Sequence, residues 1–353
     1  MTKASIQAVA REAGVSTSTV SRAFAKPDLV LPETRERVMA AARKLDYRVS
    51  RSAAALKSGQ SFRVALLMSG GVTWFNASVY AGLGSVLRPA GYDIAVFPMS
   101  SAADRRSFFE DLPVRRNADA VIVGSFDIDP GEVARLKRMA VPIVGVNIPS
   151  PAGFDAGVSI DDRAAERAAA EHLVTLGHRR IAFVGYGGDE AGADPHALRF
   201  SATARLRGVL DACAAHAAQG VEATVLNLPA DRDRDRANAA VELILSAMPV
   251  PTAVCVCEDG LAVPTLLRLR QYGREVPGDL SLVGFDDNPY AAPVGLTTVH
   301  QDPFAMGAAA ARKTLALIAG EPLGEGTPAG LAFETPAAPL VLRETTAPLN
   351  RAG

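Results

Sequence analysis

Apolar residues recur at spacings of three and four along the first part of the chain, a period that predicts helices rather than strands. A first helix is expected between Ser5, which can cap its N-terminus, and Gly14, which can end it. Its inward positions are Ile6, Val9, Ala10 and Ala13. The short step over residues 13–16 then leads directly into a second helix, as in a helix-turn-helix.

The second helix is capped by Ser16 and directs Val20 and Phe24 inward, with Val15 anchoring its start. A third helix is predicted over 32–45, with proline in its first turn and inward positions at Val38, Ala41, Ala42 and Leu45. Three short helices of this kind predict a small all-α bundle at the start of the chain.

The pattern changes after residue 63, where continuous apolar runs alternate with amphipathic helical stretches. Buried parallel strands joined by helices produce such runs. Seven units exceed one ordinary domain, so we expect two doubly wound α/β lobes, with a ligand cleft at the carboxyl ends of their strands. The runs lie at 64–68, 93–97, 118–123, 141–146, 180–185, 252–257 and 280–285.

Composition describes an ordinary globular protein, with 48% hydrophobic and 21% charged residues among 353. No apolar stretch is long enough to span a membrane, and the first residues lack the apolar region of a secretory signal. Three cysteines do not form a disulfide framework and fit a reducing compartment. We therefore expect a cytoplasmic protein.

The net charge of −1 conceals an asymmetry along the chain. Residues 1–60 carry eleven Lys and Arg against five acids, a balance of +6, which leaves −7 on the remainder. A basic head on an acidic body is the charge distribution of a nucleic-acid-binding protein, although a merely solvated basic surface remains an alternative on charge alone.

The stretch GVSTSTVSRAF at 14–24 favours DNA binding. Short hydroxyl side chains at the start of a helix can approach base edges and phosphates closely, and Arg22 can reach guanine or phosphate. An ordinary surface helix would more often carry Glu and Lys here. The outward residues are Thr17, Ser18, Ser21 and Arg22.

Together with PETRERVMAAARKLDYR, this head resembles that of the LacI/GalR family of bacterial transcriptional regulators. The resemblance continues through nearly the whole chain, in segments such as GYDIAVF, VPIVGVN, HLVTLGHRRIAFVG, VPGDLSLVGFDD, LTTVHQDPFAMG and LVLRETT. It implies an all-α DNA-binding head, a hinge helix, and an α/β core of two doubly wound parallel-sheet lobes, similar to periplasmic binding proteins.

By this resemblance the head reads an operator, and a hinge helix at 50–58 inserts Leu56 into the minor groove. A plain alanine-rich linker helix is the alternative for that segment. The DNA-binding residues so implied are Ser5, Ser16, Thr17, Ser18, Thr19, Ser21, Arg22, Ser50, Ala53, Leu56 and Lys57. The chain departs from the family pattern at Ala8, which removes the capping-box partner of Ser5, and at Val49, Ser50 and Ala54 in the hinge.

The resemblance also implies a small-molecule effector between the lobes. An aromatic face, a guanidinium and a carboxylate suit a polyhydroxy ligand, with a core position as the alternative for Trp74. Glu258 replaces the asparagine usual in the family. The added negative charge favours a neutral or partly cationic ligand over a sugar acid or phosphate, but the positive charge of Arg205 offsets this preference. The candidate effector residues are Trp74, Phe75, Ser125, Asn147, Asp161, Arg205, Glu258 and Asp286.

The resemblance gives three parts: a helix-turn-helix domain at 1–46, a hinge at 47–60 and a core at 61–353. We expect the N-terminal lobe to take about 61–160 and 291–323. The C-terminal lobe should then take about 161–290 and 324–353.

Features of other protein classes are weak. Cys255 and Cys257 share a strand face, but packing explains them better than metal binding, and no nucleophile-elbow or phosphate-loop motif occurs. We therefore predict a non-enzyme without cofactor or metal: a ligand-responsive regulator, a repressor, that binds a pseudo-palindromic operator as a homodimer with no membrane partner. The rivals are a periplasmic-type solute-binding protein, which would lack the basic head, and an enzyme, which would turn over a substrate.

Overall fold

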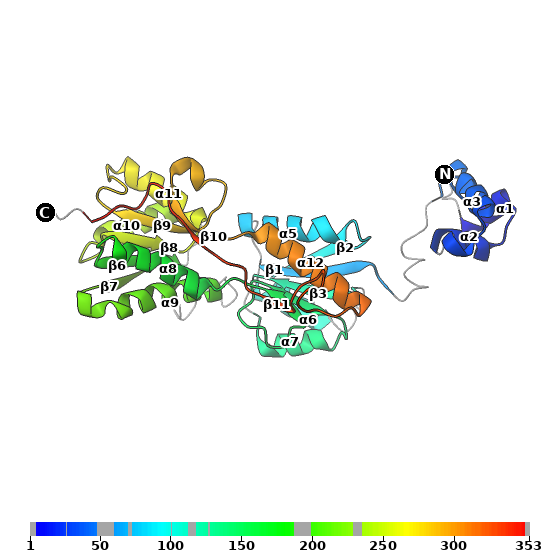
Figure 1. Cartoon of the computed structure of the whole chain (residues 1–353), viewed down its shortest axis with the longest axis horizontal. Helices are drawn as coiled ribbons and strands as arrows, with labels where there is room; N and C mark the ends of the chain where they lie inside the picture. Colours follow the sequence, from blue (N-terminus) through cyan, green and yellow to red (C-terminus); the bar gives the residue numbers. More distant parts are fainter. Residues whose placement is uncertain are drawn as a thin grey trace. The chain divides into compact units, whose positions relative to one another are not determined.

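A computed structural model describes residues 5–25, 27–47, 60–69, 73–99, 101–111, 118–125, 128–186, 199–228 and 235–349. The chain divides into two compact units, Met1–Phe62 and Arg63–Gly353 (Figure 1).

The first unit is a bundle of α1 (Ile6–Ala13), α2 (Thr17–Ala25) and α3 (Pro32–Lys44), with a short 3₁₀ turn, η1 (Pro27–Leu29). Ser5 caps α1 by accepting a hydrogen bond from the Ala8 backbone, and Gly14 ends the helix at φ 64°. The expected apolar positions meet in one small core, which contains Val9, Ala10, Ala13, Val20, Ala23, Val38, Ala41 and Ala42. The helix-turn-helix read from the sequence is therefore confirmed.

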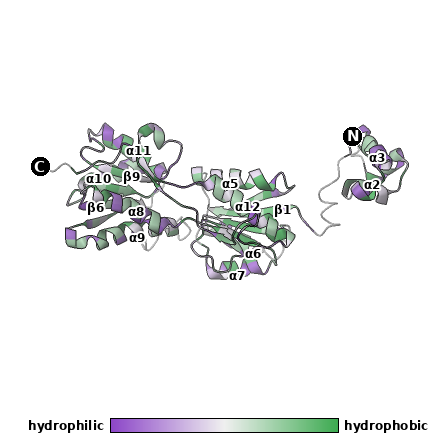
Figure 2. Ribbon diagram, in the orientation of Figure 1, coloured by the Kyte–Doolittle hydropathy of each residue, from purple (hydrophilic) through white to green (hydrophobic). Residues whose placement is uncertain are grey.

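The second unit contains two six-stranded sheets, each covered by helices, and its strands are the most apolar part of the chain (Figure 2). The first sheet has the order β11-β5-β4-β3-β1-β2, and all of its pairs are parallel. Its strands are β1 (Arg63–Ser69), β2 (Asp93–Met99), β3 (Ala120–Gly124), β4 (Ile143–Val146), β5 (Ala156–Val158) and β11 (Phe333–Glu334). Its helices are α5 (Trp74–Leu87), α6 (Ala102–Asp111), α7 (Pro130–Lys137) and α12 (Pro303–Ala319).

The second sheet has the order β12-β10-β9-β8-β6-β7, and only the pair of β12 with β10 is antiparallel. Its strands are β6 (Arg180–Tyr186), β7 (Glu222–Leu228), β8 (Ala253–Val256), β9 (Ser281–Asp286), β10 (Thr297–His300) and β12 (Leu340–Val341). The accompanying helices are α8 (Asp162–Thr175), α9 (Arg199–Ala215), α10 (Arg236–Ser246) and α11 (Asp259–Gln271), with short 3₁₀ turns η2 (Ala217–Gln219) and η3 (Ala292–Val294).

The expected division of the C-terminal third between the lobes is wrong in two places. β10, which the sequence assigned to the first lobe within 291–323, pairs with β9 in the second sheet. β11, which was assigned to the second lobe within 324–353, pairs with β5 in the first. The chain therefore passes between the sheets three times, after β5, after β10 and after β11, because these short strands add to the edges of both sheets.

Close helix packing holds α12 on the first lobe beside α5 (Figure 1). A Cβ at Gly82 would overlap the backbone carbonyl of Phe304, and one at Gly307 would overlap that of Val79. The two helices can approach so closely only because both positions are glycine.

Lys313 on α12 is fully buried and fastens the last crossing segment to the first lobe. Its ammonium donates to the carbonyls of Ala329 and Leu331 and to the carboxylate of Glu334 on β11. A buried charge is tolerated only when it is paired and hydrogen-bonded in this way.

We expect Lys313→Met to lower the free energy of unfolding by about 3 kcal/mol, because it leaves a carboxylate and two carbonyls without their donor. Urea unfolding followed by circular dichroism measures this change. The matched control is Arg312→Met at the adjacent exposed position. Equal stability of the two variants would contradict the role given to Lys313.

Candidate functional sites

The start of α2 presents a cluster of exposed hydroxyl groups. Ser16 caps the helix by accepting a hydrogen bond from the Thr19 backbone at 3.1 Å, and its Oγ lies 2.7 Å from Ser18 Oγ and 2.9 Å from Thr19 Oγ1. Thr17, Ser18 and Arg22 are exposed, and Ser21 and Thr19 are half-buried. Ser16 and Thr19 thus help to shape the start of the helix, while Thr17, Ser18 and Arg22 are free to meet a partner.

Part of the predicted DNA-binding set lies outside the described residues, namely Ser50, Ala53, Leu56 and Lys57, with the departures Val49 and Ala54. The hinge helix therefore stays a prediction. The departure Ala8 is described: Ser5 keeps its bond from the Ala8 backbone, at 3.3 Å, and an alanine side chain cannot complete the reciprocal half of a capping box.

In the core, several predicted effector residues lie directly after strands, with strained backbones. Ser125 follows β3 at φ 51°, Asn147 follows β4 at φ 50°, and Asp286 ends β9 at φ 126°. Residues other than glycine rarely adopt positive φ, and such strain concentrates at functional sites. All three side chains are also buried.

Arg205 on α9 is the centre of a buried polar cluster in the second lobe. Its Nε donates to Asp162 Oδ1 at 2.8 Å, and its Nη1 donates to the Cys257 carbonyl. Nη1 also lies 3.9 Å from Asp286 Oδ1, and the guanidinium lies 3.6 Å from the centroid of the Phe285 ring. One cation thereby joins α8, α9 and the ends of β8 and β9.

Several carboxyl groups surround this guanidinium. Burial raises the pKa of Glu166 to about 8, although the charge of Arg205 lowers it, and burial likewise raises the pKa of Asp162 and Asp286. Among the described residues neither oxygen of Glu166 has a hydrogen-bond partner. The neighbouring Cys255 thiol, a weak donor, also lowers the Glu166 pKa. The cluster therefore holds more carboxyl groups than one guanidinium can neutralise.

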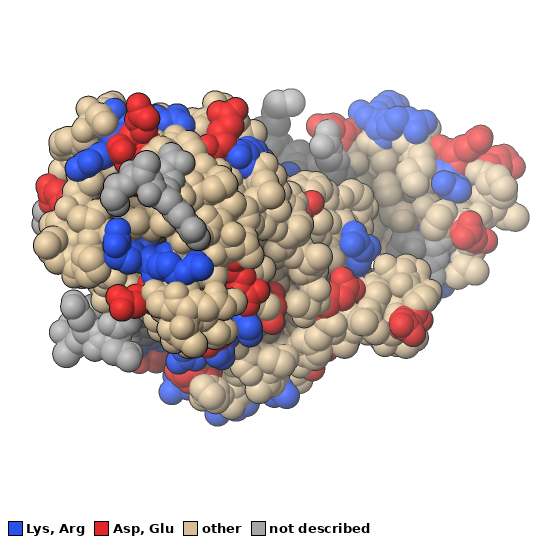
Figure 3. Space-filling model, turned by 60° about the vertical axis from the view of Figure 1, so that its left-hand side comes forward, with Lys and Arg blue, Asp and Glu red and all other residues tan. Residues whose placement is uncertain are grey.

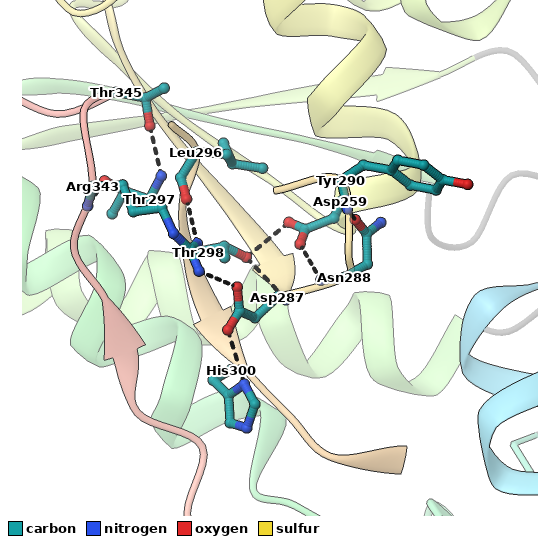
Figure 4. Close-up of polar contacts among 10 residues, drawn as sticks. All are labelled: Asp259, Asp287, Asn288, Tyr290, Leu296, Thr297, Thr298, His300, Arg343 and Thr345. Carbon is teal, nitrogen blue, oxygen red and sulfur yellow. Dashed lines mark hydrogen bonds and ion pairs between the residues drawn. The ribbon is translucent and has the colours of Figure 1, made fainter. Parts of the chain in front are cut away.

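A second polar network, around Asp259 and Asp287, holds the end of β9 against β10 (Figure 4). Asp259 accepts from Thr298 Oγ1 at 2.7 Å and from the Asn288 backbone at 3.0 Å, and burial raises its pKa to about 7. Asp287, at φ 55°, lies 3.0 Å from His300 Nδ1 and 2.6 Å from the guanidinium of Arg343.

Two adjacent aspartates, Asp286 and Asp287, each bind a residue next to a segment that crosses between the lobes. Gln301, which follows β10, donates from its amide to Asp286 Oδ1, while Arg343, which follows β12, binds Asp287. A change at Asp286 is thus transmitted directly to a crossing segment.

One hydrogen bond joins the two lobes at the strand ends. Asn147 of the first lobe donates from Nδ2 to Ser201 Oγ on α9, at 3.3 Å, and both residues are buried. The Ser201 hydroxyl in turn interacts with the Asp162 carboxyl and helps to lower its pKa, against the larger effect of burial, which raises it. The first lobe is thus connected to the Arg205 cluster through two small polar side chains.

The remaining predicted effector residues have varied surroundings. Trp74 and Phe75 begin α5 at the carboxyl end of β1 and are half-buried, so neither is a fully buried core residue. Asp161 is exposed and caps α8 by accepting from the Ala164 backbone; its neighbour Asp162 is the buried partner of Arg205. Glu258 accepts a hydrogen bond of 2.6 Å from the Tyr186 hydroxyl.

The sequence did not single out four residues whose side chains hydrogen-bond the side chains of predicted effector residues. Asp162 was obscured by its neighbour in the pair Asp-Asp, and Ser201 belongs to no motif. Tyr186 ends β6, and a tyrosine after an apolar run was a signal that could have indicated a strand-end side chain. Gln301 follows β10 in the same manner, but β10 was assigned to the other lobe. The missed residues are Asp162, Tyr186, Ser201 and Gln301.

Comparison with known proteins agrees with this architecture. Residues 5–50 match the family of bacterial regulatory proteins called lacI, and residues 170–346 match the periplasmic binding protein-like domain. An HTH-type transcriptional regulator of Mycobacterium tuberculosis is 30% identical over 85% of this chain and 87% of its own length. The regulator CelR of Thermobifida fusca is 30% identical over 90% of this chain and 92% of its own.

The chain belongs to the lacI family of transcriptional regulators.

Solved structures share the fold. The CelR–cellobiose complex has a TM-score of 0.65 and 28% identity, covering 97% of this chain and 100% of that one. The Lac repressor dimer bound to operator and an anti-inducer has a TM-score of 0.80 at 23% identity, covering 98% and 100%. This lacI-family chain therefore shares with these structures a small helical head and a core of two α/β lobes.

Within the described part of the chain, no helix is both long and apolar enough to cross a membrane.

We expect Glu166→Gln to stabilise this lacI-family protein at alkaline pH. The pKa of about 8 in the fold lies above the ordinary 4.5, so the folded protein holds a proton that the unfolded chain loses between these values. The free energy of unfolding of the wild type therefore falls as pH rises through this window, and glutamine, which does not titrate, removes that loss.

Urea unfolding at about pH 5 and about pH 8 tests this expectation. The control is Glu110→Gln, at an exposed position of α6. The advantage of Glu166→Gln over the wild type should grow toward the higher pH. An advantage that is the same at both pH values would show that Glu166 is not protonated in the fold.

Proposed function

We propose that the protein is a repressor that binds a pseudo-palindromic operator as a homodimer and responds to a small sugar-like effector held between its lobes. The observation that carries the effector is the set of buried, strained strand-end residues Ser125, Asn147 and Asp286, together with Arg205. In parallel α/β sheets this edge is where ligands bind. The sugar class is supported by cellobiose in the CelR complex.

The head supports operator reading through its exposed hydroxyl cluster and Arg22. Small hydroxyl side chains let the helix approach the bases, and an arginine can make two hydrogen bonds to guanine. A dimer presents two such helices, so we infer two half-sites related by a two-fold axis. We place the regulator in the cytoplasm, where its DNA is accessible.

The core supports a response to ligand through the contacts that meet at Asp286. This side chain lies beside Arg205 in the second lobe and accepts from Gln301 on a crossing segment. A ligand that binds one arrangement of the lobes more tightly shifts the population toward it, and the hinges follow. No catalytic step is proposed, since these groups are engaged in binding and positioning.

We expect Arg22→Ala to weaken operator binding by about 1–3 kcal/mol and to relax its sequence preference, because a base-reading side chain is lost. Fragments of genomic DNA captured by the wild-type protein and sequenced supply the operator, and fluorescence anisotropy measures both proteins on it. Unchanged discrimination between operator and scrambled DNA would remove Arg22 from the reading role. Failure of the wild type to select any palindrome would overturn the proposed function.

We expect Asp286→Asn to abolish the effect of ligand on operator binding while the protein without ligand binds the operator normally. The substitution replaces the carboxyl group at the strand end by an amide at nearly constant volume. A panel of mono- and disaccharides identifies a ligand that alters operator anisotropy of the wild type, and the variant is titrated with it. A retained response would move the effector site away from this strand end.

A further inference from the structure

The charges around Arg205 constrain which effector can bind, if the proposed effector site is correct. The guanidinium interacts with Asp162, Asp286 and Glu166, and Glu258 lies close enough to Asp286 to disfavour its ionisation. By contrast, acidic and basic side chains are interspersed on the outer face of the second lobe (Figure 3). Around Arg205, by comparison, the carboxyl groups outnumber the single guanidinium.

Arg205 is already occupied by partners within the fold. Nε is bound to Asp162, Nη1 is bound to the Cys257 carbonyl, and one face of the guanidinium lies on Phe285. An anionic effector would have to displace these contacts and also approach Asp286 and Glu258. Like charges at such distances repel strongly in a buried site. The arrangement therefore disfavours a sugar acid or a phosphate.

Glu258 has no cationic partner of its own among the described residues. Its Oε1 accepts from the Tyr186 hydroxyl at 2.6 Å, and the nearby Arg236 donates to that hydroxyl, at 3.2 Å, rather than to the carboxylate. Arg236 also lies 5.0 Å from the centroid of the Tyr186 ring. Tyrosine thus separates the two charges, and the carboxylate of Glu258 remains available to a ligand.

Two of the unsatisfied polar atoms at the predicted effector site can only accept hydrogen bonds, whereas the Ser125 hydroxyl, also without a partner among the described residues, can donate or accept. Within the described chain, Gln301 Oε1 and Asn147 Oδ1 are buried without a hydrogen-bond partner, although the amide nitrogen of each residue donates to a neighbour. The carboxylate of Asp286 fixes the orientation of the Gln301 amide, because only the nitrogen can donate to it. A buried acceptor left without a donor is costly, so the ligand that completes this site should supply donors.

We propose that the effector is an amine-bearing, sugar-like molecule, such as an amino sugar, whose ammonium binds against Asp286 and Glu258. An ammonium carries three donors, no acceptor and a positive charge, which matches both the surplus of carboxylates and the free acceptors. The sugar hydroxyls and ring remain for the half-buried aromatic residues Trp74 and Phe75 of the first lobe. The proposal deepens the proposed function and rests on it.

Isothermal titration calorimetry of the full-length protein tests the proposal with matched probes: D-glucosamine, D-glucose and D-glucuronate, and the corresponding galactose set. We expect the amine of at least one set to bind at least about tenfold more tightly than its neutral counterpart, and the acid to bind most weakly of the three. A preference for the neutral sugar or the acid, or no binding of either amine, would overturn the proposal.

Proton release distinguishes charge recognition from a chance fit of the ring. A bound ammonium favours the ionised forms of the neighbouring carboxyls, so amine binding should release protons to the buffer. The apparent binding enthalpy should therefore differ between phosphate and Tris in proportion to their ionisation enthalpies. Equal enthalpies in the two buffers would contradict placement of the ammonium among these carboxyls.

The variant Glu258→Gln retains an acceptor for Tyr186 and removes only the charge. We expect it to lose about tenfold in affinity for the amine and much less in affinity for the neutral sugar. Glu325→Gln, at an exposed position, is the matched control. Equal losses for amine and neutral sugar would show a purely structural role. If only neutral sugars alter operator binding, the proposed function stands and this inference alone fails.

Discussion

The second lobe is organised around a single buried guanidinium with too many carboxyl groups about it. Arg205 binds Asp162 and the Cys257 carbonyl, stacks on Phe285 and approaches Asp286, so that two helices and two strand ends share one cation. Removing a buried charge from such an arrangement costs more than the pair contributes, because its partners are left uncompensated. The ends of β8 and β9 are thereby held near the same cation.

The same constraint connects binding with movement. Asp286 and Asp287 both have positive φ, and their side chains hold Gln301, His300 and Arg343, which flank the segments that cross between the lobes. On the first lobe, Asn147 reaches Ser201 and through it Asp162. A ligand that changes the partners of Asp286 or Asn147 therefore acts on residues that join the lobes, without a long chain of intermediates.

Local patterns predicted most of the fold. The head followed from helical spacing and caps, and the seven apolar runs all became strands. Fully buried parallel strands such as β3, β4, β8 and β9 carry an unbroken apolar signal. β7, at a sheet edge, was missed because half of its side chains are polar or exposed, as in Glu222–Leu228. β10 and β11 were given to the wrong lobes, since the partner of a short edge strand depends on contacts distant in sequence.

The candidate site was predicted less completely than the fold. Its place at a strand end pointed to Asn147, and resemblance to the family pointed to Arg205 and Asp286. Asp161 was chosen in place of Asp162. The residue at which α8 begins decides which of the two adjacent aspartates caps the helix and which is buried against Arg205, and the sequence does not fix that residue. Ser201 and Gln301 act through neighbours brought together by the fold, so no local pattern could indicate them.

The central claim is that one chain binds DNA with its head and a small molecule with its core, and that the two binding events are coupled. The most direct test measures ligand affinity twice, with the full-length protein alone and with the protein saturated by its operator. Linkage requires that operator changes ligand affinity by the same factor by which ligand changes operator affinity. We expect both affinities to change, and to change by the same factor. Ligand affinity that is identical with and without operator would contradict the account.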